Sequence, residues 1–169
     1  FKQFKNGPKI LYASSSTAYE PWRNPYAMSK HYMETIAPHN ALAMRFTTVY
    51  GPGAREKMLI PKILKNDVDY INVDHSRDFI HIDDILTAVG TLIINPIPRK
   101  PKFVDVGTGV SNNLLDILSH LNMEVKDKRI GTIFERKDNK ANIGTLTKMG
   151  WMPTIDLFDY LKGEKDGDI

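Results

Sequence analysis

The sequence predicts an α/β fold. Short apolar runs rich in β-branched and aromatic residues alternate with amphipathic stretches along almost the whole chain, which is the rhythm of strands interleaved with helices. Proline and glycine clusters end most of these runs, as they do between elements of a compact domain. With 41% hydrophobic and 25% charged residues among 169, the composition is that of an ordered globular protein with a core, which excludes wholesale disorder.

The first elements are two strands on either side of a helix. Residues 9–14 form an apolar run that ends in a cluster of small polar residues, as a buried strand does before a loop. The stretch 26–37 carries apolar side chains among good helix formers and lies between two prolines, which predicts a helix. Residues 41–50 are predicted as a second strand, because a Gly-Pro-Gly turn signal ends the run.

The rest of the chain continues the alternation in shorter pieces. Helices are predicted at residues 58–65, 83–94, 111–121, 142–149 and 156–161, with Asp83 and Ser111 as N-caps. Strands are predicted at residues 70–73, 78–82, 103–106 and 132–136. No repeat or long linker interrupts the pattern.

The chemistry centres on a tyrosine and a lysine in the predicted helix 26–37. Tyr26 and Lys30 are four residues apart, so they share one helix face. An ammonium group beside a phenol favours the ionised phenolate and lowers the pKa of the tyrosine, which can then act as a general base. Ser15 stands at the end of the preceding strand, where its hydroxyl could hold the reacting oxygen. The pattern Y-x-x-x-K alone also occurs by chance in helices.

Four motifs in this order carry a family resemblance: YASSS-x-x-Y, PYAMSK, RFTTVYGPG and RDFIHIDDI. Together, from Lys9 to about Leu161, they resemble the extended short-chain dehydrogenase/reductase superfamily of nucleotide-sugar epimerases and dehydratases. The resemblance implies a Rossmann-like parallel sheet, of which this chain holds the C-terminal part, and a small α/β substrate-binding domain. It assigns residues 1–57 to the dinucleotide-binding part and 58–169 mainly to the substrate-binding part, with 78–106 returning to the Rossmann-like sheet.

The resemblance also implies roles for individual residues. Ser15 would be the catalytic serine, with Ser16 a close second; Tyr26 would be the base and Lys30 its electrostatic partner. NAD would be the cofactor, bound by Tyr26, Lys30, Phe46 and Thr47. A nucleotide-sugar substrate would be bound by Thr17, Thr48, Arg55, Arg77 and Arg136. A guanidinium holds phosphate or carboxylate oxygens bidentately, which fits the arginines, although each of them could equally be a solvated or structurally paired side chain.

Within the superfamily, the segment from Thr48 to Met58 looks most like the UDP-glucuronate 4-epimerases, although their intervening Pro-Asp is missing here. Dehydratases of the superfamily carry an acidic residue directly after the catalytic serine or one beyond it. Ser16 and Thr17 occupy those places. We therefore expect epimerisation of a UDP-hexuronate or UDP-hexose through a 4-keto sugar rather than dehydration.

The sequence lacks the glycine-rich G-x-x-G-x-x-G turn that binds the dinucleotide pyrophosphate in the superfamily. The segment Gly107-Thr108-Gly109 has no third glycine in register and is interpreted as a local structural turn. We expect the exposed half sheet to be covered by a separate N-terminal half chain or by a homodimer partner, unless the chain is a fragment of a longer protein. The alternative function is a non-catalytic remnant or a nucleotide-sugar-binding subunit.

Composition excludes several other classes. The chain has no cysteine, which removes disulfides, thiolate nucleophiles and cysteine zinc sites and favours the reducing cytoplasm. Its 5 histidines show no metal-binding spacing, so no metal is expected. The 23 basic and 20 acidic residues give a net charge of +3, and because the signs are interspersed we expect no nucleic-acid partner. No apolar run is long enough for a membrane helix, so no membrane partner is expected either.

Overall fold

The computed structural model describes residues 3, 5–98 and 100–166. Its strands are β1 (Ile10–Ser15), β2 (Ala41–Phe46), β3 (Thr48–Tyr50), β4 (Tyr70–Asn72), β5 (Ser76–Arg77), β6 (Phe79–His81), β7 (Phe103–Val106), β8 (Asn112–Asn113) and β9 (Asp127–Arg129). Its helices are η2 (Ser16–Tyr19), η3 (Pro21–Arg23), α1 (Pro25–Ile36), α2 (Leu59–Leu64), α3 (Ile82–Ile94), α4 (Leu114–His120), α5 (Gly144–Lys148) and α6 (Leu157–Asp166). The predicted α/β class is confirmed.

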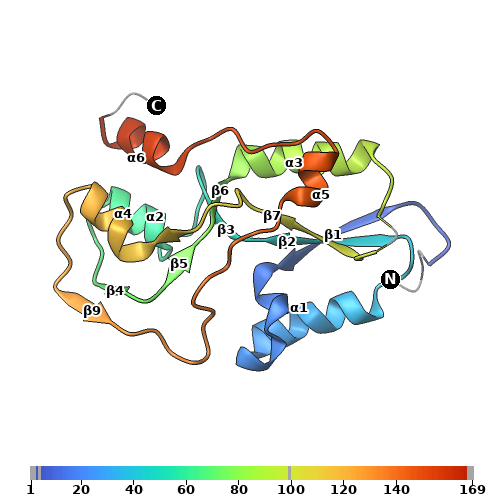
Figure 1. Cartoon of the computed structure of the whole chain (residues 1–169), viewed down its shortest axis with the longest axis horizontal. Helices are drawn as coiled ribbons and strands as arrows, with labels where there is room; N and C mark the ends of the chain where they lie inside the picture. Colours follow the sequence, from blue (N-terminus) through green and yellow to red (C-terminus); the bar gives the residue numbers. More distant parts are fainter. Residues whose placement is uncertain (1–2, 4, 99, 167–169) are drawn as a thin grey trace.

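The main sheet is parallel, with the order β1-β2-β7. The central strand β2 is buried over its first five residues, as expected of a strand covered on both faces. Helix α1 lies on one side of this sheet, and α3 with α5 lies on the other (Figure 1). Strand β1 forms one edge of the sheet in the described part of the chain.

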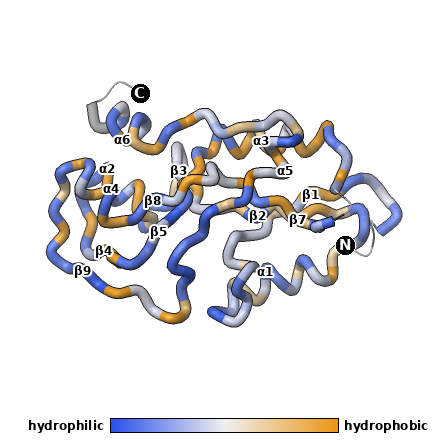
Figure 2. Tube along the Cα trace, viewed as in Figure 1, coloured by the Kyte–Doolittle hydropathy of each residue, from blue (hydrophilic) through white to orange (hydrophobic). Residues whose placement is uncertain are grey.

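Three small two-stranded pairings, β3-β6, β4-β9 and β5-β8, extend the molecule away from the main sheet. Two apolar cores result. One packs β2 and β7 against α3 and α5, around Leu42, Val104 and Leu146, and the other packs α2, α4 and α6 together, around Ile63 and Ile117. The segment 135–140 between β9 and α5 is hydrophilic and runs across the space between these two parts (Figure 2). The division at residue 57 stays a prediction.

The strand predicted at residues 41–50 is two strands. The backbone N–H of Thr47 donates to the carbonyl of Val106, in β7, but the N–H of Thr48 donates to the carbonyl of Asp78. The chain therefore leaves the main sheet between these two residues, and β3 pairs with β6 instead. The change of partner is a tertiary effect that the continuous apolar pattern did not indicate.

The two predicted N-caps are wrong. The side chain of His81 accepts from the N–H of Asp83, so α3 begins one residue earlier than predicted. Asn113 caps α4, because its side-chain oxygen accepts from the N–H of Leu115. Ser111 lies outside the helix, and its hydroxyl donates to Asp138 at 2.5 Å.

The strand predicted at residues 132–136 is also wrong. Strand β9 forms further upstream, paired with β4. Carbonyls of the predicted segment accept from side chains instead: Arg23 donates to Ile133 and Asn24 donates to Phe134. A β-prone sequence forms a strand only where another backbone pairs with it.

No helix in the described part of the chain is long and apolar enough to cross a membrane. The described residues also contain no group of three or more His, Cys, Asp or Glu side chains arranged to hold a metal ion.

Candidate active site

A cleft of about 790 Å³ lies at the carboxyl ends of β1 and β2, where parallel α/β sheets usually bind ligands. Every residue predicted for the site lines it: Ser15, Ser16, Thr17, Tyr26, Lys30, Phe46, Thr47, Thr48, Arg55, Arg77 and Arg136. These residues come from β1 and η2, from α1, from the β2–β3 crossing, and from three later segments. The fold thus gathers residues separated by up to about 120 positions into one cavity.

The serines lie where β1 turns into η2. The Ser15 hydroxyl oxygen accepts from the N–H of Thr17 at 3.2 Å and from the Thr17 hydroxyl at 3.0 Å. The oxygen of this hydroxyl therefore has no lone pair left to accept a further hydrogen bond, but its O–H can still donate one. Ser16 is only 4% exposed. Ser15 is therefore better placed than Ser16 to donate a hydrogen bond into the cleft.

The tyrosine and the lysine lie on the cleft-facing side of α1. Asn24 caps this helix by accepting from the N–H of Ala27 at 2.8 Å, and Pro25 fits its first turn. The Lys30 ammonium lies 5.6 Å from the centre of the Tyr26 ring and donates to the carbonyl of Ala13 at 3.2 Å. Tyr26 is 55% exposed, so its phenol is accessible to a ligand. The predicted effect of Lys30 on the tyrosine stays a prediction.

The predicted arginines differ in how strongly the protein holds them. Arg77 donates to the carbonyls of Ser76 and Lys137 and contacts the ring of His75, and burial lowers the pKa of its guanidinium. Arg136 donates to the carbonyl of Ser16 at 2.5 Å. Arg55 is exposed at the edge of the cleft. The guanidinium groups of Arg55, Arg77 and Arg136 thus line the same cleft as Ser15, Tyr26 and Lys30.

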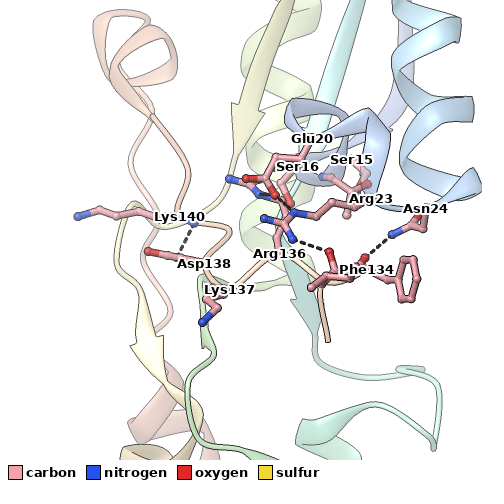
Figure 3. Close-up of polar contacts among 12 residues, drawn as sticks. Ser15, Ser16, Glu20, Arg23, Asn24, Phe134, Arg136, Lys137, Asp138 and Lys140 are labelled. Atoms are coloured by element: carbon pink, nitrogen blue, oxygen red, sulfur yellow. Dashed lines mark hydrogen bonds and ion pairs between the residues drawn. The ribbon is translucent and has the colours of Figure 1, made fainter. Parts of the chain in front are cut away.

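Glu20, Arg23 and Asn24 also line the cleft, and none of them was predicted as a site residue. They come from the segment between β1 and α1 that includes η3, and they bind the segment that contains Phe134 and Arg136 (Figure 3). These contacts join residues 110 or more positions apart. No local sequence signal could have found them.

A buried ion pair beside the cleft fixes α1 against the main sheet. Glu34 of α1 accepts from Ser14 at 2.5 Å and from the guanidinium of Arg45, with Nε at 2.9 Å and the second nitrogen at 2.5 Å. Tyr26, Lys30 and Glu34 follow at intervals of four residues, so this ion pair fixes the same helix face that carries the Tyr–Lys pair. Neither Glu34 nor Arg45 was predicted from the sequence as a residue that positions the site.

Asp78 organises the turn that was interpreted as structural. Its carboxylate accepts from the N–H groups of Thr108, Gly109 and Ala141 and from the Thr108 hydroxyl, at 2.8–3.0 Å. A Cβ on Gly107 would lie 2.8 Å from this carboxylate. Gly107 therefore serves close packing against Asp78, whereas Gly109 adopts a φ of +76° and donates its N–H to the carboxylate, in agreement with a local structural turn.

Only part of an NAD site is present among the described residues. The phenol of Tyr26 and the ammonium of Lys30 supply donors on one helix face, which fits the hydroxyls of a ribose, and Phe46 and Thr47 line the same cleft. The sequence contains no glycine-rich turn for the pyrophosphate. The residues fit the nicotinamide end of the cofactor and not its pyrophosphate.

Two curated relatives resemble the chain over most of its length. CDP-abequose synthase of Salmonella typhimurium is 31% identical over 178 residues, which cover 90% of this chain and 58% of the relative. UDP-glucuronate 4-epimerase of Thermodesulfobacterium geofontis is 29% identical, covering 82% of this chain and 48% of the relative. The chain thus spans roughly half the length of these relatives.

Solved structures share the fold. The NDP-hexosamine 5,6-dehydratase TunA superposes with a TM-score of 0.77 at 23% identity, over 94% of this chain and 62% of its own. A mutant of UDP-glucuronic acid 4-epimerase from Bacillus cereus, solved in complex with a UDP-sugar analogue and NAD, superposes with a TM-score of 0.75 at 23% identity. The match covers 94% of this chain and 60% of that one. A family model described as the NAD dependent epimerase/dehydratase family matches residues 4–107, which confirms the predicted superfamily and its cofactor, NAD. The chain belongs to the NAD dependent epimerase/dehydratase family.

Proposed function

We propose that the chain is the catalytic and substrate-binding portion of an NAD-dependent nucleotide-sugar 4-epimerase that acts on a UDP-hexuronate or UDP-hexose. The observation that carries this proposal is the presence of Ser15, Tyr26 and Lys30 in one cleft with Arg55, Arg77 and Arg136. The UDP-glucuronate 4-epimerase among the relatives supports the reaction. Because a CDP-abequose synthase and an NDP-hexosamine dehydratase are also similar to the chain, the sugar and the nucleotide base of the substrate have to be identified by experiment.

In this proposal, the chain's own groups move the proton and hold the oxygen. Tyr26 takes the proton of the sugar 4-hydroxyl while Ser15 donates a hydrogen bond to the oxygen that becomes the ketone. NAD, when bound, would supply reversible hydride acceptance at that carbon. Tyr26 would give the proton back to the oxygen when the hydroxyl is re-formed in the epimer. Lys30 holds positive charge beside the phenol throughout.

Epimerisation rather than dehydration is supported by the carboxylates of the cleft. Glu20 and Glu135 are the acidic residues that line it in the described ranges. Glu20 is paired with Arg23, and Glu135 accepts from Asn72 at 3.2 Å. Neither follows Ser15 directly, and Ser16 and Thr17 stand where the dehydratases carry an acidic residue.

Completion of the cofactor site requires a dinucleotide-binding segment. We propose that it pairs with the open edge of β1, because an unpaired parallel edge exposes backbone hydrogen-bonding groups. That segment would belong to the same polypeptide or to a separate chain; a homodimer is the other expected assembly. The absence of cysteine supports a reducing, cytoplasmic location.

A non-catalytic nucleotide-sugar-binding subunit is the second candidate, favoured by the missing glycine-rich turn. The test is calorimetric titration of the 169-residue chain with NAD and with UDP-glucuronate, followed by NMR detection of UDP-galacturonate. Once the dinucleotide-binding segment is supplied, Tyr26→Phe should abolish conversion, whereas Tyr32→Phe, an exposed tyrosine on the same helix outside the cleft, should not. Binding of the sugar nucleotide without NAD would indicate a substrate half that awaits this segment, whereas absence of conversion once NAD binds would favour the second candidate. Binding of neither would refute both.

A further inference from the structure

Two arginines share one carboxylate in the lining of the cleft (Figure 3). Glu20 pairs with Nε of Arg23, three residues along the chain, and its other close cation is Arg136, whose Nε lies 3.7 Å from the same carboxylate oxygen. The three side chains are 27%, 24% and 18% exposed, respectively. They are half-shielded from water, so their charges interact more strongly than those of an open surface pair.

The same arginines tie a distant segment across the cleft. Arg23 donates to the carbonyl of Ile133 at 2.6 Å, and Asn24 donates to the carbonyl of Phe134 at 2.9 Å. Arg136 reaches in the opposite direction, to the carbonyl of Ser16 at 2.5 Å. Both guanidinium groups are therefore fixed in position by backbone carbonyls from the opposite wall.

The hydrogen-bonding capacity of this cluster is not filled. The Nε–H of Arg136 is buried and has no hydrogen-bond partner among the described residues, and each guanidinium has five N–H donors. Two cations against one carboxylate also leave one positive charge uncompensated within the cluster. The cluster can therefore accept an anion with more oxygens and more charge than Glu20 supplies.

We propose that Arg23 is a further anion-binding residue of the substrate site and that Glu20 is an internal counter-ion, displaced from Arg23 and Arg136 when a diphosphate enters. This inference rests on the proposed function. A diphosphate offers two charges and several acceptors, which guanidinium groups bind bidentately. A neutral sugar does not compensate for the loss of Glu20, so the counter-ion discriminates against ligands that lack the diphosphate.

The test is calorimetric titration of the 169-residue chain with inorganic pyrophosphate, UDP-glucose and free glucuronate. Glu20→Gln should bind pyrophosphate and UDP-glucose about fivefold more tightly, and Arg23→Gln about tenfold more weakly, as expected for the gain or loss of a charged hydrogen bond. The double variant should lose most of the gain of Glu20→Gln. Arg23→Lys keeps the positive charge but loses the bidentate geometry of the guanidinium, so its affinity for pyrophosphate should lie between those of wild type and Arg23→Gln.

Matched controls change the same charges elsewhere. Glu56→Gln removes an exposed carboxylate paired with Lys65, and Arg129→Gln removes an exposed guanidinium paired with Asp127. Both should leave binding unchanged, and thermal unfolding should show that every variant folds.

The outcomes separate the inference from the proposed function. If wild type binds UDP-glucose and the Glu20 and Arg23 variants match the controls, the inference is wrong and the proposed site stands. If Glu20→Gln strengthens only glucuronate binding, the anion is a sugar carboxylate and the diphosphate assignment is wrong. If neither wild type nor Glu20→Gln binds any of the three probes, the inference and the nucleotide-sugar site both fail.

Discussion

Replacing Glu34 with glutamine should destabilise the protein more than any surface charge change. The carboxylate joins α1 to β1 and β2, because it accepts from Ser14 and from two nitrogens of Arg45. The Arg45 and Glu34 side chains are only 5% and 10% exposed. The guanidinium also packs 4.1 Å from the ring centre of Tyr19 and 3.5 Å from that of Phe103, which shields it further from water.

The magnitude follows from the charge left behind. Removing one partner of a buried ion pair costs about 3–5 kcal/mol, because the other charge stays buried without compensation. Glutamine keeps one carbonyl oxygen for Ser14 and for Nε of Arg45, so we expect about 3 kcal/mol, from the lower end of that range. Glu56→Gln, which removes an exposed carboxylate, should cost at most about 1 kcal/mol.

Urea unfolding followed by circular dichroism measures these differences as shifts of the midpoint at constant slope. A double variant, Glu34→Gln with Arg45→Met, separates charge from packing. Its penalty should be smaller than that of Glu34→Gln alone, because no unpaired charge remains buried. A loss below about 1 kcal/mol for Glu34→Gln would refute the reasoning, since a buried pair would then behave like a surface pair.

Three other perturbations follow from the structure. A backbone hydrogen bond from Gly131 lowers the pKa of Asp74 to about 2; the stability this contributes is present above the ordinary carboxyl pKa near ~4 and is lost as the pH falls towards 2. The urea midpoints of wild type and Asp74→Asn should therefore differ at pH 7 and converge as the pH approaches about 2. Asp78→Asn should cost about 3 kcal/mol in urea unfolding, because a fully buried carboxylate with four hydrogen bonds loses its charge and part of its acceptors; a variant as stable as wild type would contradict this. Gly107→Ala should lower the unfolding free energy by about 1–3 kcal/mol, because its Cβ would lie 2.6 Å from that of Ala141; an unchanged thermal midpoint would show that the turn can open.

The main sheet and its covering helices could be predicted because their signals are local. Strand β2 is apolar apart from Arg45, and α1 begins at Pro25 and ends two residues before Pro38. The strand expected at residues 132–136 failed for a non-local reason. Thr132, Ile133 and Phe134 are residue types that favour strands, but side chains of Arg23 and Asn24 occupy carbonyls that a neighbouring strand would need.

The residues of the candidate site also fall into those that local motifs indicate and those that depend on distant contacts. Ser15, Tyr26 and Lys30 stand within short motifs, and the fold places the N-terminal half of α1 beside the carboxyl end of β1, where parallel sheets bind ligands. Glu20 and Arg23 belong to no motif. Their place in the cleft depends on a segment more than 100 residues away, and spacing along the sequence carries no information about it.

Buried carboxylates in this chain serve the architecture rather than proton transfer. Asp84, which with Asp83 forms an acidic pair in the sequence, is 2% exposed and accepts from the N–H groups of Thr154 and Ile155. Asp105 accepts from the N–H of Asn142 in the same way. Together with Asp78, which accepts from the N–H of Ala141, these side chains bind the backbone of residues 141–155 to the rest of the fold. Since the buried aspartates are occupied by backbone donors and lie outside the cleft lining, proton transfer in the proposed reaction falls to the phenol of Tyr26.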